Sequence, residues 1–149
     1  MELRVATAED IPQIQVVRNA VKENVLSNPA LVPDEDVLDY ISCRGKGWVA
    51  IVGEIIVGFA IADLADHSIW ALFLLPEYEG RGIGRQLHDT MVDWYFTQTK
   101  GTIWLSTAEN TRAELFYSTA GWTPVGRKGK MEIKFEMSYK GWQKKRMSL

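Results

Sequence analysis

A turn with three closely spaced glycines follows a run of apolar residues in the middle of the chain. Gly80, Gly82 and Gly84 alternate with other residues there, and apolar residues at helical spacing come next. Such a turn exposes backbone N–H groups at the N-terminus of a helix, which favours a bound phosphate or pyrophosphate. Arg81 and Arg85 would add two full positive charges. The pattern predicts an anion site, although the same spacing is also typical of a tight strand-to-helix connection that binds nothing.

Two common nucleotide-binding motifs do not describe this turn. It lacks the lysine followed by serine or threonine that a nucleoside-triphosphate P-loop needs. It also lies in mid-chain rather than opening a βαβ unit with an acidic residue about 20 positions further on, as a dinucleotide fingerprint does. The sequence therefore argues against both classes.

The elements that would position this turn follow one another without a repeat or a linker. Thr7 followed by Asp10 is typical of a capping box, and Gly53–Glu54 has the spacing of a hairpin turn. The patterns predict strands over Glu2–Ala6, Trp48–Val52, Ile55–Leu64, Ser68–Leu75, Gly101–Thr107, Trp122–Arg127 and Met131–Tyr139, and helices over Ile11–Asn24, Asp34–Ile41, Ile83–Thr99 and Thr111–Ala120. The order βααβββαβαββ predicts an α+β fold with a mixed central sheet of about seven strands flanked by about four helices. His88 is expected near the surface of the long helix, and the basic residues 140–149 are expected to form a frayed end.

Length and composition limit the class of protein. The 149 residues suit a single domain spanning 1–149, and 46% hydrophobic against 24% charged residues is the balance of a globular chain. A net charge of −2 argues against a nucleic-acid partner. Cys43 is the only cysteine and there are two histidines, so neither a disulfide nor a metal site is expected. No apolar run reaches the roughly 20 residues of a membrane helix, and the first residues do not resemble a signal peptide, so a cytoplasmic protein is expected.

Two segments of the chain match a known family. Glu79–Gly84 resembles motif A of the Gcn5-related N-acetyltransferase (GNAT) superfamily, in which Gln or Arg is followed after two residues by Gly, one residue and Gly or Ala. Glu79 departs from the usual Gln or Arg at the first position. Asn110–Trp122 is similar to the later family motif of Asn, Ala, Tyr and Gly followed by an aromatic residue. The likeness is strongest over Val57–Trp122 and weakest over Val25–Lys46.

The resemblance implies an acyl-CoA site between two splayed parallel strands, Ser68–Leu75 and Gly101–Thr107. Pantetheine would pair with backbone near Phe73–Leu75, and N–H groups near Leu74 and Leu75 would polarise the thioester oxygen. Pyrophosphate would lie over Glu79–Arg85. The residues implied in cofactor binding are Phe73, Leu74, Leu75, Glu79, Gly80, Arg81, Gly82, Ile83, Gly84, Arg85 and Asn110. The amide of Asn110 can donate and accept, but the same residue is also a natural helix N-cap.

The resemblance also implies that Tyr117 protonates the departing CoA thiolate. A phenol with a pKa of about 10 is suited to this step, although an aromatic residue here can equally be a core residue. The attacking amine needs a base, and the strand Gly101–Thr107, where many relatives have a Glu, contains no acid. The candidates elsewhere are Asp63, Asp66, His67, Glu23 and a relayed water.

The function implied is transfer of an acetyl group from acetyl-CoA to a primary amine by direct attack, without a metal. A small metabolite, a polyamine and a protein amine all remain candidate acceptors, with Glu23–Tyr40 and Arg127–Met131 expected to wall their site. The alternative from another class is an acyl-CoA sensor or interaction module without catalysis. An exposed strand edge expected at Met131–Tyr139 is compatible with a homodimer.

Overall fold

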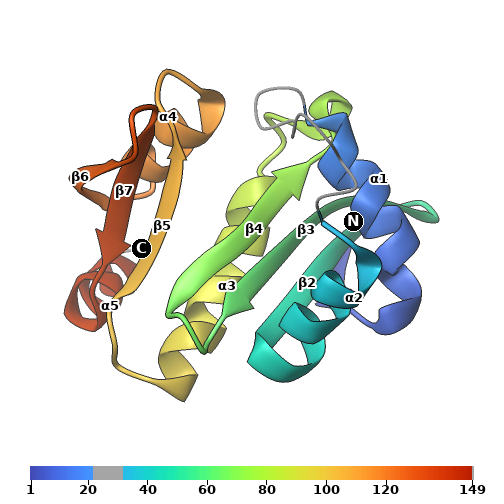
Figure 1. Ribbon diagram of the computed structural model, residues 1–149, viewed down its shortest axis with the longest axis horizontal. Helices are drawn as coiled ribbons and strands as arrows, with labels where there is room; N and C mark the ends of the chain where they lie inside the picture. The colour runs from blue at the N-terminus through green and yellow to red at the C-terminus, as the bar shows by residue number, and fades with distance from the viewer. Residues whose placement is uncertain (22–31, 149) are drawn as a thin grey trace. The chain divides into compact units, whose positions relative to one another are not determined.

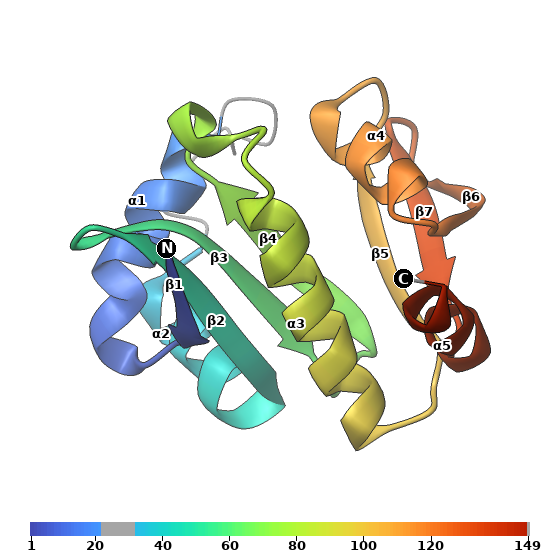
Figure 2. The same cartoon turned by 180° about the vertical axis from the view of Figure 1, so that it is seen from behind.

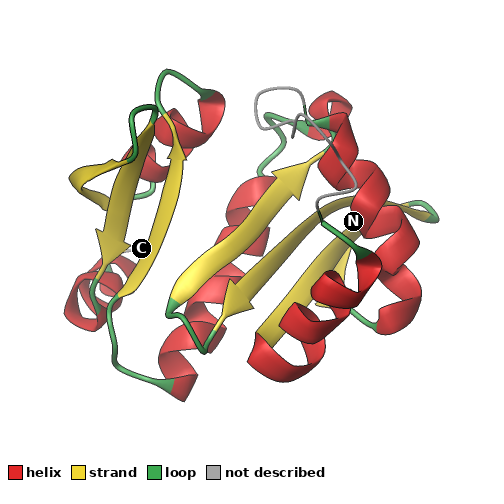
Figure 3. Ribbon diagram, viewed as in Figure 1, coloured by secondary structure: helices red, strands yellow, loops and turns green. Residues whose placement is uncertain are grey.

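The computed structural model describes residues 1–21 and 32–148. The chain divides into two compact units, Met1–Tyr95 and Phe96–Leu149 (Figure 1). Both units contain helices and strands, as Figure 3 shows. The α+β class and the predicted order of elements are confirmed, whereas the single domain expected from the chain length stays a prediction.

The first unit is a four-stranded antiparallel sheet with helices on both faces. Its strands lie in the order β1-β2-β3-β4. Helices α1 and α2 cover one face, and α3 covers the other (Figures 1 and 2). The elements are β1 (Glu2–Val5), α1 (Ile11–Ala20), α2 (Asp34–Asp39), β2 (Gly45–Val52), β3 (Ile55–Asp63), β4 (Ser68–Leu74) and α3 (Ile83–Gln98).

The second unit contains three antiparallel strands and two helices. Its elements are β5 (Ile103–Ala108), α4 (Arg112–Thr119), β6 (Thr123–Lys128), β7 (Glu132–Met137) and α5 (Tyr139–Met147). Strand β7 lies between β5 and β6 and pairs with both. The edge expected at Met131–Tyr139 is therefore wrong, because the backbone of β7 is bonded on both sides, and β7 gives no basis for the expected homodimer.

Two other expectations about the elements are wrong. Helix α1 ends at Ala20, because Val21 adopts extended backbone with φ −85° and ψ 108°; the expected end at Asn24 lies outside the described residues. The basic end of the chain is the helix α5 rather than a frayed segment. Trp142 is buried there, and the Ser138 hydroxyl caps the helix by accepting from the Gly141 N–H at 3.0 Å.

The capping box predicted at the start of α1 is confirmed. The Asp10 carboxylate accepts from the Thr7 N–H at 2.8 Å and from both terminal nitrogens of Arg4, at 2.8 and 2.9 Å. The Arg4 hydrogen bonds and the Thr7 N–H together hold the pKa of Asp10 below its usual range, even though burial opposes this. A buried carboxylate with this many donors fixes the point at which the chain leaves β1 and enters α1.

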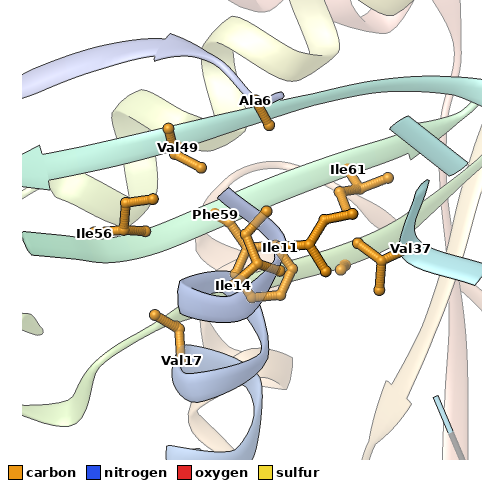
Figure 4. Close-up of a cluster of buried hydrophobic side chains, with 10 residues drawn as sticks. Ala6, Ile11, Ile14, Val17, Val37, Val49, Ile56, Phe59 and Ile61 are labelled. Atoms are coloured by element: carbon orange, nitrogen blue, oxygen red, sulfur yellow. The ribbon is translucent and has the colours of Figure 1, made fainter. Parts of the chain in front are cut away.

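The core of the first unit lies between α1, α2 and the sheet (Figure 4). Ile14 and Val17 from α1 and Val37 from α2 are at most 1% exposed and meet Phe59 and Ile61 of β3. Strand β3 is buried on both faces because α3 covers its other side. Because β3 is buried on both faces, it is a rigid strand, and β4 is positioned by its pairing with β3.

Glycine at position 58 of β3 lets α3 approach the sheet closely. A Cβ at Gly58 would lie 2.7 Å from the Leu74 Cδ1 and 3.1 Å from the Leu87 Cδ1. These two side chains come from β4 and α3 and fill the space that a larger residue would take. The end of β4 and the first turns of α3 are therefore packed directly on β3.

No helix within residues 1–21 and 32–148 is long and apolar enough to cross a membrane. The same ranges contain no group of three or more His, Cys, Asp or Glu residues placed to hold a metal ion.

We expect Ile14→Ala to lower the free energy of unfolding by roughly 2–5 kcal/mol, because it leaves a cavity in this core. Val16, two residues away on α1, is 64% exposed, so Val16→Ala should change stability by no more than about 0.5 kcal/mol. Urea unfolding of both variants checks the difference. Equal losses would contradict the assignment of the inward face of α1.

Candidate functional site

The end of β4 leads through a short 3-10 turn into the glycine segment. The Leu75 N–H donates to the Val57 carbonyl at 2.7 Å, and the Leu75 carbonyl accepts from the Tyr78 N–H at 2.9 Å. Gly80 and Gly82 follow with φ of 77° and 82°, a left-handed backbone that glycine adopts without cost. A Cβ at either residue would meet nothing within 4 Å. The backbone of this turn therefore borders open space, as a ligand in direct contact with it requires.

Helix α3 begins at Ile83 and directs its first N–H groups towards the glycine turn. The Gln86 N–H bonds the Gly82 carbonyl at 3.1 Å, so the N–H groups of residues 83–85 lie ahead of the first intrahelical bond. This end of a 16-residue helix carries a partial positive charge. The N–H groups of residues 83–85, within the segment Glu79–Arg85 where an anion site is predicted, are therefore not used by bonds within α3.

The two arginines of the turn differ in their surroundings. Arg81 is exposed, and its guanidinium lies 4.9 Å from the centre of the Tyr78 ring. Arg85 is half-buried, and its Nε donates to the Asp89 Oδ1 at 3.1 Å. Part of the charge expected from Arg85 is therefore neutralised, and Arg81 is the more available cation.

His88 is fully buried, so its expected position near the surface is wrong. It lies on the inward face of α3, and its Nδ1 is 2.8 Å from the Asp89 Oδ1. Burial favours a raised pKa of Asp89, but contacts with His88 and then Arg85 outweigh it and lower that pKa. Asp89 is therefore ionised, and its carboxylate orients the Arg85 guanidinium.

The two N–H donors expected on β4 reduce to one. Backbone groups of an antiparallel strand point alternately to its two sides, and the Leu75 N–H points to β3, where Val57 accepts it. Leu75 therefore cannot offer its N–H to a ligand. The N–H of Leu74 points to the opposite edge of β4, so Leu74 is the remaining candidate donor.

Phe73 lies on the face of β4 that is covered by α1. Its ring is tilted against Phe59, with centroids 5.5 Å apart. Phe73, Leu74 and the glycine turn thus belong to the first unit, whereas Asn110 and Tyr117 belong to the second.

Tyr117 is a buried residue of α4. It is 6% exposed, and its ring meets those of Trp122 and Phe135 with centroid distances of 5.6 and 6.3 Å. Burial raises the pKa of Tyr117 above its usual value. The ring therefore packs in a core, and the predicted acid role concerns its hydroxyl, which is protonated at neutral pH.

Asn110 is not the N-cap of α4. That position belongs to Thr111, whose hydroxyl accepts from the Glu114 N–H at 3.3 Å. The Asn110 backbone N–H donates to the Glu114 Oε1 at 2.8 Å, and φ is 61°. The side-chain amide is exposed and has no hydrogen-bond partner in the part of the chain that is described. A strained residue with an unused amide favours the ligand interpretation over the capping one.

Asp63 is not a free base. It is 2% exposed, its Oδ2 accepts from the Arg44 Nη2 at 2.9 Å, and its Oδ1 accepts from the Asp66 N–H at 3.2 Å. Both oxygens are therefore engaged in holding the β3–β4 turn, and this candidate is corrected to a structural residue.

The other candidate bases lie around the same turn or outside the described residues. His67 is exposed, has a φ of 55°, and its Nδ1 is 2.7 Å from the Tyr95 hydroxyl. Burial raises the pKa of Tyr95 to about 12, so this partner stays neutral. Asp66 is exposed in the turn. Glu23 lies outside the described residues.

Arg18 is a further residue at this site that no sequence motif indicates. It points from α1 over β4, where its guanidinium carbon is 5.0 Å from the centre of the Trp70 ring and 5.2 Å from that of Phe73. The only sequence signal was a charged residue next to Val17 on the inward side of a predicted helix.

A model of the acetyltransferase (GNAT) family matches residues 18–122 of the 149-residue chain. The chain therefore belongs to this family, as the two motifs predicted. The match includes the glycine turn, Asn110 and Tyr117.

Solved structures share the fold at low sequence identity. The PaiA N-acetyltransferase from Thermoplasma acidophilum, in complex with coenzyme A, is 16% identical with a TM-score of 0.79, and the match covers 93% of this chain and 100% of that one. A ribosomal-protein-alanine N-acetyltransferase from Brucella melitensis is 19% identical with a TM-score of 0.75, covering 93% and 99%. The ribosomal-protein-S18-alanine N-acetyltransferase from Escherichia coli is 14% identical with a TM-score of 0.74, covering 93% of each chain. Likeness at these identities establishes the fold.

We expect Asn110→Gly to be at least as stable as the wild-type protein and Asn110→Ala to be less stable by about 1 kcal/mol. Glycine adopts the left-handed backbone freely, whereas alanine has a Cβ and lacks the local hydrogen bonding that helps asparagine there. All three keep the backbone bond to Glu114. Thermal unfolding checks the order, and an Asn110→Ala variant as stable as Asn110→Gly would contradict the strained backbone.

Proposed function

We propose that this protein transfers an acetyl group from acetyl-CoA to a primary amine. The observation that carries the proposal is the glycine turn at the end of β4, with φ of 77° at Gly80 and 82° at Gly82 and open space beside both. In a chain of the GNAT family, a turn of this kind at the N-terminus of a helix suits the pyrophosphate of CoA.

The residues of the first unit match successive parts of the acetyl-CoA molecule. The N–H groups of residues 83–85 and the exposed guanidinium of Arg81 would hold the pyrophosphate. The edge of β4 that faces away from β3, to which Leu74 directs its N–H, would pair with the pantetheine arm, as a further strand would. In the second unit, the unused amide of Asn110 would bind the same arm.

The proposed reaction has balanced proton transfers. The amine nitrogen forms a bond to the acetyl carbon, the carbon–sulfur bond breaks, the amine loses a proton to a base and the sulfur gains one from Tyr117. The Leu74 N–H would stabilise the charge that develops on the thioester oxygen. The raised pKa of Tyr117 keeps its proton in place until a thiolate forms nearby. With Asp63 engaged by Arg44, the candidate bases are Asp66, His67, Glu23 and a relayed water.

A second candidate function is binding of acyl-CoA without catalysis. The observation that favours it is the lack of an acid on β5, which reads Ile-Trp-Leu-Ser-Thr-Ala, together with the engagement of Asp63. The donor would then act as a signal that changes the stability or contacts of the protein.

Calorimetric titration of acetyl-CoA, followed in the same sample by a screen of amines for CoA thiol release, tests the proposal. Binding with release for one amine class would establish the transferase. Binding without release across small amines, polyamines and peptide amines would favour the acyl-CoA sensor. A protein that binds no acetyl-CoA would contradict both functions.

Tyr117→Phe should lower kcat by about 10²- to 10⁴-fold, the usual range for loss of a general acid, while the affinity for acetyl-CoA stays nearly the same. Phenylalanine preserves the packing against Trp122 and Phe135, so the change removes the hydroxyl alone. Tyr139→Phe, which removes a hydroxyl that accepts from Gln143 on α5, is the matched control. Steady-state kinetics of both variants measure the effect, and unchanged turnover would remove Tyr117 from the mechanism.

A further inference from the structure

Two of the three guanidinium nitrogens of Arg18 are buried without a hydrogen-bond partner among the described residues. Its Nε and Nη1 are inaccessible to solvent and bond no atom of the chain within the described ranges. Hydrogen bonds or charges normally satisfy such groups, and leaving them unmade costs stability. The side chain nonetheless points inward from α1 rather than outward to water.

Three other half-buried arginines each have a carboxylate partner, although the Arg44 Nε is also buried without a hydrogen bond to a described residue. Arg4, Arg44 and Arg85 are half-buried, and each binds an aspartate, at 2.8, 2.9 and 3.1 Å respectively. Arg18 is half-buried as well, but no ion pair with a described residue forms there. Burial lowers the pKa of Arg18, and no carboxylate of the described chain counters it. Among the described residues, Arg18 therefore has no carboxylate partner, whereas Arg4, Arg44 and Arg85 each have one.

Aromatic rings form the surroundings of this charge. Trp70 and Phe73 lie under the guanidinium, and Tyr40 stacks on Trp70 with ring centroids 3.9 Å apart and planes 10° apart. Cation–π contact offsets part of the desolvation of a guanidinium but supplies no hydrogen-bond acceptor. The guanidinium is thus held in place, and its Nε and Nη1 have no acceptor among the described residues.

The position of this group on β4 connects it to the proposed chemistry. Arg18 lies over Phe73, and the next residue is Leu74, whose N–H is the candidate donor to the thioester. A molecule bound to Arg18 would therefore lie beside the strand position at which acetyl transfer is proposed. This is where an acceptor, rather than the pyrophosphate end of CoA, would be held.

We propose that Arg18 binds a carboxylate of the acceptor, so that the substrate is a small amine carrying a carboxylate, of the amino acid class. This inference rests on the proposed acetyl transfer. The Arg18 Nη2 is not among the buried atoms, so its charged N–H group can reach a ligand, and a carboxylate oxygen is the acceptor that matches it in charge. A phosphate monoester carries close to two negative charges and would need a second cation. The nearby Arg44 does not supply one, because Asp63 already neutralises it.

Matched pairs of amines test the proposal. Glycine, L-alanine, L-phenylalanine, L-glutamate and L-lysine are each compared with their α-carboxamides in the thiol-release assay, alongside spermidine and O-phosphoethanolamine. We expect one or more free acids to exceed the matching amide by about 10- to 100-fold in kcat/KM, the effect of losing a charged hydrogen bond. Arg18→Met should abolish this preference by raising KM for the acid, and Arg18→Lys should restore only part of it.

Two controls separate recognition from a structural role. Arg146→Met removes an exposed arginine of α5 that lies 5.5 Å from the Trp142 ring, and it should leave the preference unchanged. Without substrate, Arg18→Met should melt no lower than the wild-type protein, because the change removes a half-buried charge that no carboxylate of the described residues pairs. An equal loss of activity towards acid and amide in Arg18→Met would overturn the proposal, as would preferred turnover of spermidine or O-phosphoethanolamine.

Ligand-induced melting distinguishes failure of this inference from failure of acetyl transfer. The preferred free acid should raise Tm of the wild-type protein and not that of Arg18→Met. If no amine releases CoA but an acid still raises Tm through Arg18, acetyl transfer fails and the carboxylate site stands. If acetyl transfer is observed but depends neither on the carboxylate nor on Arg18, the transferase stands and the inference is overturned.

Discussion

The rest of this structure depends on the different hydrogen bonding of the two edges of strand β4. One side is bonded to β3, up to the Leu75 N–H on the Val57 carbonyl, and β3 is itself buried between helices on both faces. The other side leaves backbone groups such as the Leu74 N–H directed away from β3. The glycine turn, the start of α3 and the aromatic surface under Arg18 all take their positions from this strand. A change that shifted β4 by one residue would exchange its two sides and remove the proposed donor.

Much of this arrangement follows from local sequence rules. Each strand and helix of the order βααβββαβαββ had a period, a cap or a glycine that marked it, such as Thr7 with Asp10 and the glycines after β4. The family, and with it the fold, followed from two motifs whose spacing depends on backbone geometry. The side of β4 to which a given N–H points depends on the register with β3, which local sequence does not encode, so the sequence predicts Leu74 and Leu75 together as donors.

The errors have a common physical origin in tertiary contacts. Helix α5 has lysines, an arginine and a glycine where an apolar stripe would be expected, and Trp142 alone anchors it by burial. His88 is polar but lies in the inward row of α3, and a neighbouring aspartate makes its burial acceptable. Arg18 was overlooked for a related reason: a charged residue on an inward helical position is usually assigned to the surface. The contacts of the Arg18 guanidinium with the rings of Trp70 and Phe73 show that this side chain points inward.

The Arg85–Asp89 pair bears on how the proposed cosubstrate would leave. A CoA-dependent transferase must release its spent donor in every cycle, so binding that is too strong would slow turnover rather than help it. Asp89 neutralises part of one of the two cations beside the glycine turn, and its own ionised state is secured by the buried His88. The turn would therefore bind the CoA pyrophosphate through oriented backbone dipoles more than through net charge. Binding of this kind suits a cosubstrate that is exchanged in each cycle better than it suits a permanently bound group.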